Sequence, residues 1–173
     1  MTKKQDNILS AALELFANEG FNATSTNQIA KKAGVSEGLI FKHFKNKKGL
    51  LDALVRQVEG KLGEAFSPVI FETKPNEIIK NTIEIPFKMP DADYNFWRLQ
   101  FKLKWEVEYH HPEKMKPIKD KLTSAFAELN YDSPEMEAGL LQHLIESISV
   151  NILREGKESQ IAYKDFLLEK YKL

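Results

Sequence analysis

Apolar side chains recur three or four positions apart along most of the chain, which is the spacing of one face of an α-helix. Residues 3–19 show this spacing at Ile8, Leu9, Ala12, Leu15 and Phe16. Residues 134–154 repeat it at Met136, Leu140, Leu144, Ile148 and Ile152. The pattern predicts an all-α fold with about nine helices.

Helix-ending and helix-starting residues are closely spaced near the N-terminus. Gly20 stands where a left-handed residue ends the first helix. Ser25 and Gln28 form a capping-box pattern that starts a second helix, and Gly34 follows its last apolar position. Ser36 is a suitable N-cap for a third helix. The chain is therefore expected to form three short helices in succession.

A tight Gly-Val-Ser turn between the second and third helices predicts a helix-turn-helix motif over about 25–44. We expect it to lie in a first domain of residues 1–60, followed by a larger helical domain of residues 61–173. The later elements expected are a long helix from Lys48 to about Phe66, a proline-flanked connector over 67–75, and helices over about 76–88, 93–111, 113–129, 134–154 and 160–171.

The segment 93–111 fits two periodicities. From Phe101 to Tyr109 apolar and charged residues alternate, which is typical of a strand. As a helix, the same segment pairs Lys102 with Glu106 at the i,i+4 spacing of favourable ion pairs. We favour the helix because no second strand exists nearby for pairing.

Composition narrows the classes of protein. The 173 residues include no cysteine, which excludes disulfides and thiolate metal sites. The N-terminal sequence MTKKQDNILSAALELF is amphipathic rather than continuously apolar, unlike a signal peptide. No apolar run approaches the roughly 18 residues of a membrane span. We expect a cytoplasmic protein.

Charge is unevenly distributed. Residues 1–58 hold nine lysine and arginine residues against five aspartate and glutamate residues, a net charge of +4. The whole chain balances 25 against 25, so the remainder carries −4. This division indicates that the first part meets a polyanion, although a solvated lysine-rich face would give the same numbers.

The third helix has an unusual outer face. Ile40 and Phe44 are expected to point inward, which leaves Leu39, Phe41 and Lys42 outward. In a DNA major groove an apolar side chain can contact a thymine methyl group, and a lysine can donate to guanine acceptors. Gly38 would allow the backbone to approach closely.

Residues 7–54 resemble the N-terminal domain of the tetracycline-repressor (TetR) family of bacterial transcription regulators, through the pattern G-V-S-x-G-x-(L/I)-(Y/F)-x-H-F-x-x-K. The resemblance implies that residues 37–44 form the recognition helix and that Lys47 contacts a DNA phosphate. One departure is Phe41, where the family usually has a tyrosine whose hydroxyl reaches a phosphate. The predicted DNA-binding residues are Thr24, Ser25, Thr26, Ser36, Glu37, Gly38, Leu39, Phe41, Lys42, His43 and Lys47.

Several of these residues have alternative roles. Lys42 is expected to read a base, with a phosphate contact as the alternative. Glu37 can accept from cytosine or interact with the dipole of its own helix. His43 can contact DNA or pack partly against the protein.

Aromatic residues cluster between Phe66 and Tyr109, within the predicted second domain. Aromatic stripes at helical spacing usually belong to a core, but the resemblance implies an effector pocket in this region. The predicted ligand-binding residues are Phe66, Phe87, Tyr94, Trp97, Phe101, Trp105 and Tyr109. The neighbouring pair His110 and His111 is expected at the surface rather than at a metal, because adjacent helical residues point apart.

The expected function is that of a homodimeric repressor that binds a palindromic double-stranded DNA operator and is released by a small apolar or aromatic effector. Its dimer interface would lie within about 134–171, where the stripe Leu140, Leu144, Ile148 and Ile152 faces the second copy or, alternatively, the subunit's own core. No cofactor, metal site, membrane partner or catalytic motif is expected. The alternative function is a helical module that binds DNA without sequence preference, with a C-terminal domain for protein partners.

Overall fold

The computed structural model describes residues 2–104, 109 and 112–173, and within them the chain is helical without any strand. The elements are α1 (Lys3–Asn18), α2 (Thr26–Ala33), α3 (Glu37–Phe44), α4 (Lys47–Ile70), α5 (Pro75–Lys88), η1 (Asp91–Asp93), α6 (Tyr94–Leu103), η3 (Pro112–Met115), α7 (Lys116–Glu128), α8 (Pro134–Glu155), η4 (Lys157–Gln160) and α9 (Ile161–Lys170). The predicted all-α fold with about nine helices is confirmed.

Local capping signals set the N-terminal helices. Gly20 and Gly34 adopt positive φ values of 97° and 67° at the ends of α1 and α2. The Ser25 hydroxyl accepts from the amide of Gln28, and the Gln28 side chain accepts from the amide of Ser25, so the predicted capping box is present. These contacts satisfy amides that a helix start leaves without partners, and they explain why α2 begins where the sequence indicates.

Helix α4 is longer than the sequence suggested. The segment 67–75 was expected to be a connector because of its prolines, but α4 continues through Pro68 to Ile70. Pro68 has no amide to donate to the carbonyl of Glu64. The Ser67 hydroxyl donates to that carbonyl instead, at 2.9 Å. The prediction was wrong because a neighbouring side chain replaces the missing backbone donor.

The segment predicted as one helix over 93–111 is helical from Tyr94 to Leu103. The strand alternative, which covered 101–109, is therefore wrong for residues 101–103. Lys104 forms the cap, and residues 105–108, 110 and 111 lie outside the described residues. The remainder of the predicted helix therefore stays a prediction.

Contacts divide the chain into two compact units. The first comprises Met1–Leu62 and Ala92–His110, and the second comprises Gly63–Asp91 and His111–Leu173. Helix α4 contributes residues to both. The sequence predicted a single boundary after residue 60. In the structure, α6 follows that boundary in the chain but belongs to the first unit, because it packs against α1.

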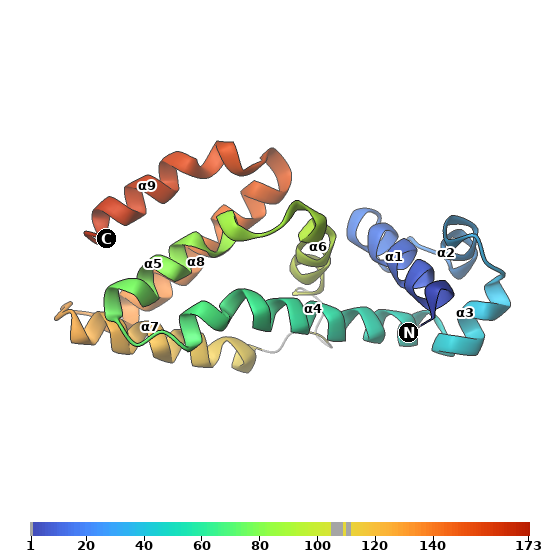
Figure 1. Ribbon diagram of the computed structural model, residues 1–173, viewed down its shortest axis with the longest axis horizontal. Coiled ribbons are helices and arrows are strands. Elements are labelled where there is room, and N and C mark those ends of the chain that lie inside the picture. Colours follow the sequence, from blue (N-terminus) through green and yellow to red (C-terminus); the bar gives the residue numbers. More distant parts are fainter. Residues whose placement is uncertain (1, 105–108, 110–111) are drawn as a thin grey trace. The chain divides into compact units, whose positions relative to one another are not determined.

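The first unit is built around a core that α1 shares with α2, α3, α4 and α6 (Figure 1). Phe16, Ile29, Ile40 and Leu50 are completely buried in it. The ammonium group of Lys102 on α6 donates to the carbonyl of Asn18 at 2.9 Å, which ties α6 to the end of α1. Helix α3 has only eight residues, and the side chains on its inner side attach it to this core.

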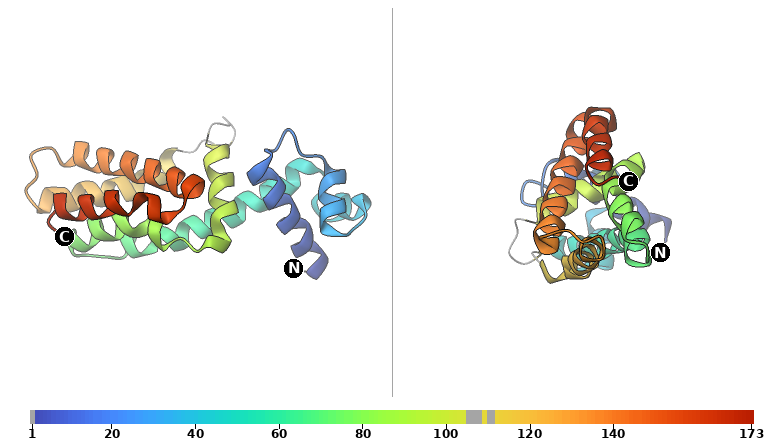
Figure 2. Two further views of the ribbon diagram at one scale, coloured as in Figure 1. Left: turned by 90° about the horizontal axis from the view of Figure 1, so that it is seen from above. Right: turned by 90° about the vertical axis from the view of Figure 1, so that its left-hand side faces the viewer.

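In the second unit α5, α7, α8 and α9 lie side by side (green, gold, orange and red in Figure 2). Phe126 of α7 is fully buried and stacks at an angle against Tyr131 and Tyr171. The Tyr171 hydroxyl donates to the carboxylate of Glu137 at 3.1 Å, linking the end of α9 to α8. Burial and this bond to a carboxylate raise the pKa of Tyr171 above its usual range.

Candidate DNA-binding surface

Helix α3 is held by a single fully buried side chain, Ile40, together with the partly buried Phe44. The turn before it is closed by the amide of Val35, which donates to the carbonyl of Ala30 at 3.0 Å. Ser36 is the N-cap of α3, although its side chain makes no capping hydrogen bond. Leu39 is partly buried and also packs against the core, whereas Gly38, Phe41 and Lys42 are exposed.

The outer face of α3 carries the predicted mixture of residue types. Phe41 is 45% exposed, Lys42 is exposed, and Leu39 is partly buried. Lys42 has no hydrogen bond or ion pair within the described part of the chain. A β-carbon added at Gly38 would find no atom within 4 Å. Nothing inside the protein therefore requires a glycine at this position.

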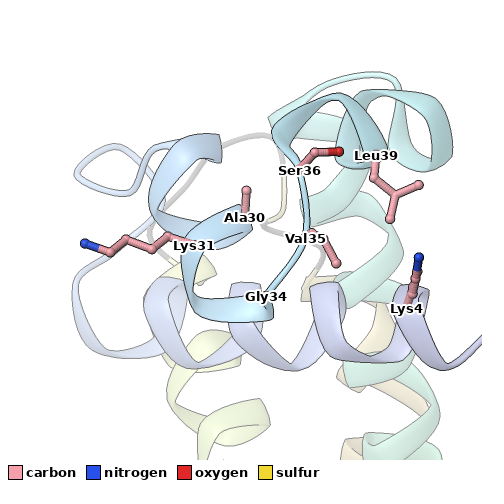
Figure 3. A pocket seen from close by; sticks show the side chains of 7 residues that line it. All are labelled: Lys4, Ala30, Lys31, Gly34, Val35, Ser36 and Leu39. Atoms are coloured by element: carbon pink, nitrogen blue, oxygen red, sulfur yellow. The ribbon is translucent and has the colours of Figure 1, made fainter.

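A shallow hollow of about 390 Å³ lies beside α3, between the α2–α3 turn and the start of α1. Leu39 lines it from α3, Ser36 from the turn before α3, and Lys4 from α1 (Figure 3). In this view the ammonium of Lys4 rises toward Leu39, and Lys31, which also lines the hollow, extends away from these two residues. The hollow gives Leu39 a position at the edge of a basic, open surface.

Glu37 has a partner inside the domain. Its carboxylate accepts a hydrogen bond from the hydroxyl of Thr26, which is the first residue of α2. This contact joins the starts of α2 and α3. Neither of the roles that the sequence offered for Glu37 included it, because residues eleven positions apart have no fixed geometry until the turn between them is built.

Thr24 has no exposed side chain for DNA. It is only 1% exposed, and its hydroxyl donates to the carbonyl of Gly20 at 2.8 Å. The prediction that the Thr24 side chain binds DNA is therefore corrected: Thr24 closes the loop between α1 and α2. Ser25 is exposed and Thr26 is partly buried at the start of α2.

Lys47 is more deeply engaged than the resemblance implied. Its ammonium donates to the carbonyls of Phe21 and Thr24, at 2.9 and 3.0 Å, and lies 4.3 Å from the centre of the Phe21 ring. An ammonium group has three protons, so two of them hold the α1–α2 loop and one remains for another acceptor. Lys47 is thus a structural clamp in the position predicted for a phosphate contact.

The junction between α3 and α4 is strained. Lys45 has φ 67° and ψ −49°, and the amide of Asn46 donates to the carbonyl of Phe44 at 2.8 Å. This is a γ-turn with positive φ, a rare conformation for a residue with a side chain. The Asn46 side chain then accepts from the amide of Gly49 and starts α4. A β-carbon at Gly49 would lie 2.1 Å from the Phe44 carbonyl oxygen, so the turn depends on glycine there.

His43 contacts a residue that the sequence analysis did not consider. Its Nδ1 atom lies 3.3 Å from Nε2 of Gln5 on α1. A signal was present in the sequence, since Thr2 and Gln5 form a second capping box at the start of α1. That pattern predicts that the Gln5 side chain bonds to the amide of Thr2. Its contact with His43 depends on how α1 and α3 are placed in the folded domain.

The predicted ligand-binding residues do not form one described cavity. Tyr94, Trp97, Phe101 and Tyr109 belong to the first unit, Phe66 and Phe87 to the second, and Trp105 lies outside the described residues. Trp97 is 8% exposed, and it leaves no space for a water molecule where it meets Val58, Leu62 and Phe96. The Tyr109 hydroxyl donates to Asp52 at 3.1 Å. In this conformation, Trp97 is part of a packed core.

Two helices of the second unit expose large apolar side chains. Met136 and Leu140 on α8 are 74% and 46% exposed, and Ile161 and Phe166 on α9 are 43% and 62% exposed. The predicted stripe along α8 continues inward instead, because Ile148 and Ile152 are buried within the subunit. For those two residues the interface prediction is wrong, and the alternative of an internal core is confirmed.

The described residues show neither an apolar helix long enough to cross a membrane nor a cluster of three metal-ligating side chains. His110 and His111, which the sequence placed at the surface, lie outside the described residues. The basic surface around α3 thus remains the main candidate site.

Comparison with known proteins gives this surface a context. Residues 8–54 match the model of a family described as bacterial regulatory proteins, tetR family. Over 78 residues the chain is 41% identical to YvkB, an uncharacterized HTH-type transcriptional regulator of Bacillus subtilis (strain 168), covering 45% of this chain and 39% of YvkB. The chain thus matches less than half the length of this curated relative.

The whole chain is similar in structure to solved regulators. KstR2, the ketosteroid transcriptional regulator of Mycobacterium tuberculosis, has a TM-score of 0.78 at 17% identity, covering 98% of this chain and 95% of KstR2. FadR from Bacillus subtilis, solved in complex with stearoyl-CoA, has a TM-score of 0.68 at 20% identity, covering 96% of each chain. At these identities the likeness shows the fold.

Proposed function

Because the chain belongs, through residues 8–54, to the tetR family of bacterial regulatory proteins, we propose that it is a homodimeric, ligand-responsive transcription repressor. Residues 1–60 bind double-stranded DNA, and residues 61–173 bind an effector and form the dimer. The observation that carries the proposal is the outer face of α3, where Lys42, Phe41 and the open Gly38 stand on a helix held from its inner side by Ile40.

The chemistry of this face suits a major groove. Lys42 can donate to guanine acceptors, and Leu39 can contact a thymine methyl group. Phe41 cannot donate to a phosphate, so it packs against sugar. The hydroxyl proton of Ser25 and the amide of Thr26 are donors at the start of α2, since the Ser25 amide already serves Gln28 and the Thr26 hydroxyl already serves Glu37. The remaining proton of Lys47 offers one further donor to a phosphate.

Dimerisation is supported by exposed apolar side chains on α8 and α9. Met136, Leu140, Ile161 and Phe166 lie within the 134–171 interval, and contact with a second copy would remove such side chains from water. Two copies of α3 would then read the two halves of a near-palindromic operator.

Release from DNA requires an effector that binds the non-DNA conformation more tightly, since only a difference in affinity shifts the equilibrium. FadR was solved with stearoyl-CoA, and KstR2 is described as a ketosteroid regulator. These relatives support an apolar effector for this chain. Its binding would open the packed aromatic residues around Trp97 and shift α4, whose residues contribute to both units.

Selection from a random duplex library, followed by footprinting, tests the proposal. We expect a bounded protected region with dyad symmetry and a dimer by light scattering. Lys42→Ala should relax the base preference at one position of each half-site. Protection without boundaries would instead favour the module that binds DNA without sequence preference, and a monomer that selects no duplex would refute both the DNA-binding and the dimer proposals.

The site of action and the effector response can be tested separately. A cytoplasmic location follows from the proposed role and is checked by cell fractionation. Trp97→Ala should alter the response to an effector found by screening apolar and aromatic compounds, while duplex binding is retained. A normal response in this variant would remove Trp97 from the proposed ligand site.

A further inference from the structure

The first turn of α1 meets the recognition helix at the side chains of Gln5 and His43. Both residues are partly buried, and the atoms that meet are Nε2 of Gln5 and Nδ1 of His43, 3.3 Å apart. The other end of the Gln5 amide is held at the helix start, where Oε1 accepts from the amide of Thr2 at 2.8 Å. The Gln5 side chain therefore bridges a helix cap and a residue of the recognition helix.

This bridge determines the direction of every hydrogen bond in it. A backbone amide can only donate, so the atom of Gln5 facing Thr2 must be its carbonyl oxygen. The atom facing His43 is then the amide nitrogen, which can only donate. Consequently Nδ1 of His43 must be the acceptor, and the proton of the neutral imidazole must sit on Nε2.

The opposite ring nitrogen is available to another molecule. Within the described residues Nε2 of His43 has no hydrogen-bond partner in the protein. The ring is further oriented by an edge contact with Phe44, with ring centres 6.3 Å apart. His43 thus holds a directed N–H donor on the helix that carries Leu39 and Lys42.

We propose that Gln5 is a positioning residue of the DNA surface: it fixes the His43 tautomer so that Nε2–H donates to an acceptor on the operator. The acceptor is a phosphate oxygen or a guanine N7 or O6 atom, which share the ability to accept this proton. The assignment rests on the proposed DNA-binding function, but the tautomer itself is a property of the free protein.

A substitution at Gln5 can reverse the hydrogen bond without removing the helix cap. In Gln5→Glu the carboxylate still accepts from Thr2, because glutamate serves the same capping box. Facing His43, however, a carboxylate can only accept, so it requires a proton on Nδ1. Gln28→Glu is the matched control, because Gln28 occupies the same position in the capping box of α2 and has no contact with His43.

The first measurement is nitrogen-15 NMR of the imidazole rings in the free protein at about pH 8, where histidines are mostly neutral. The His43 signals are assigned by their loss in His43→Asn. We expect the proton on Nε2 in the wild type and in Gln28→Glu, and on Nδ1 in Gln5→Glu. Gln5→Met, which removes the donor without adding charge, should leave His43 in a mixture of both forms. A wild-type proton on Nδ1, or an unchanged tautomer in Gln5→Glu, would overturn the proposal.

The second measurement is affinity for the duplex selected from the random library. Gln5→Glu should bind about tenfold or more weakly than Gln28→Glu, since a hydrogen bond from His43 is lost. Equal affinities would overturn the positioning role. If the wild type selects no duplex, the proposed function is refuted. The tautomer of His43 is still tested by NMR, because that measurement uses the free protein.

Modified duplexes identify the acceptor. Replacing single phosphates by methylphosphonates, or single guanines by 7-deazaguanine, removes one candidate acceptor at a time. At the position that His43 contacts, the difference between Gln5→Glu and Gln28→Glu should disappear. Loss of the difference at a phosphate or at a guanine supports the proposal and identifies the acceptor atom. A difference that persists with every modified duplex contradicts the proposal.

Discussion

Gly38→Ala separates the stability of the domain from its binding to DNA. Gly38 is exposed in the first turn of α3, it has no positive φ, and a β-carbon there would meet no protein atom within 4 Å. Glycine in a helix is about 0.5–1 kcal/mol less favourable than alanine. Alanine should therefore raise the free energy of unfolding by about that amount, or the melting temperature by about 1–4 °C.

DNA binding should change in the opposite direction. If the backbone at Gly38 approaches base edges closely, an added methyl group would occupy that approach. Forcing an extra carbon into a packed contact costs about 1–3 kcal/mol, which corresponds to roughly a 5- to 150-fold loss of affinity. Fluorescence anisotropy with a selected duplex measures this loss, and urea denaturation measures the stability.

Gly60→Ala is the matched control. Gly60 is also an exposed helical glycine with nothing within 4 Å of a built β-carbon, but it lies in α4. Both variants should gain similar stability, and only Gly38→Ala should lose affinity. If Gly38→Ala binds the duplex as tightly as Gly60→Ala does, the backbone at Gly38 does not approach DNA and the reasoning is refuted.

Four other substitutions test the remaining features. Lys42→Ala should lower duplex affinity by about 1–3 kcal/mol and relax one base position; a uniform loss in anisotropy across all duplexes would make it a phosphate contact. Lys47→Ala should lower unfolding free energy in urea by about 1–3 kcal/mol, because two carbonyls lose their donor, and should flatten the salt dependence of binding; unchanged values would contradict both roles. Gly49→Ala should destabilise by at least about 1–3 kcal/mol in thermal melts, since its β-carbon would meet the Phe44 carbonyl; a more stable variant would rule out this turn. Leu140→Glu should yield a folded monomer by light scattering, and a remaining dimer would move the interface elsewhere.

Helix starts and ends were predicted correctly where they depend on interactions between residues a few positions apart. The Ser25–Gln28 capping box and the left-handed Gly20 and Gly34 are confirmed because each involves only neighbouring backbone groups. Pro68 was misread as a helix end, since its effect depended on whether a nearby hydroxyl would serve the Glu64 carbonyl. A pattern of residue types does not show which of several short-range bonds forms.

The sequence by itself determined the all-α class, the helix-turn-helix and the exposure of Phe41 and Lys42 on α3, because helical periodicity and capping are properties of adjacent residues. Leu39, also expected to point outward, packs partly against the core. Only the tertiary structure decided that Lys47 clamps the Phe21 and Thr24 carbonyls, that Ile148 faces inward, and that Gln5 meets His43. These contacts join residues far apart in the chain. Their partners depend on how the helices pack, and packing is a sum over many side chains that no single stretch of sequence contains.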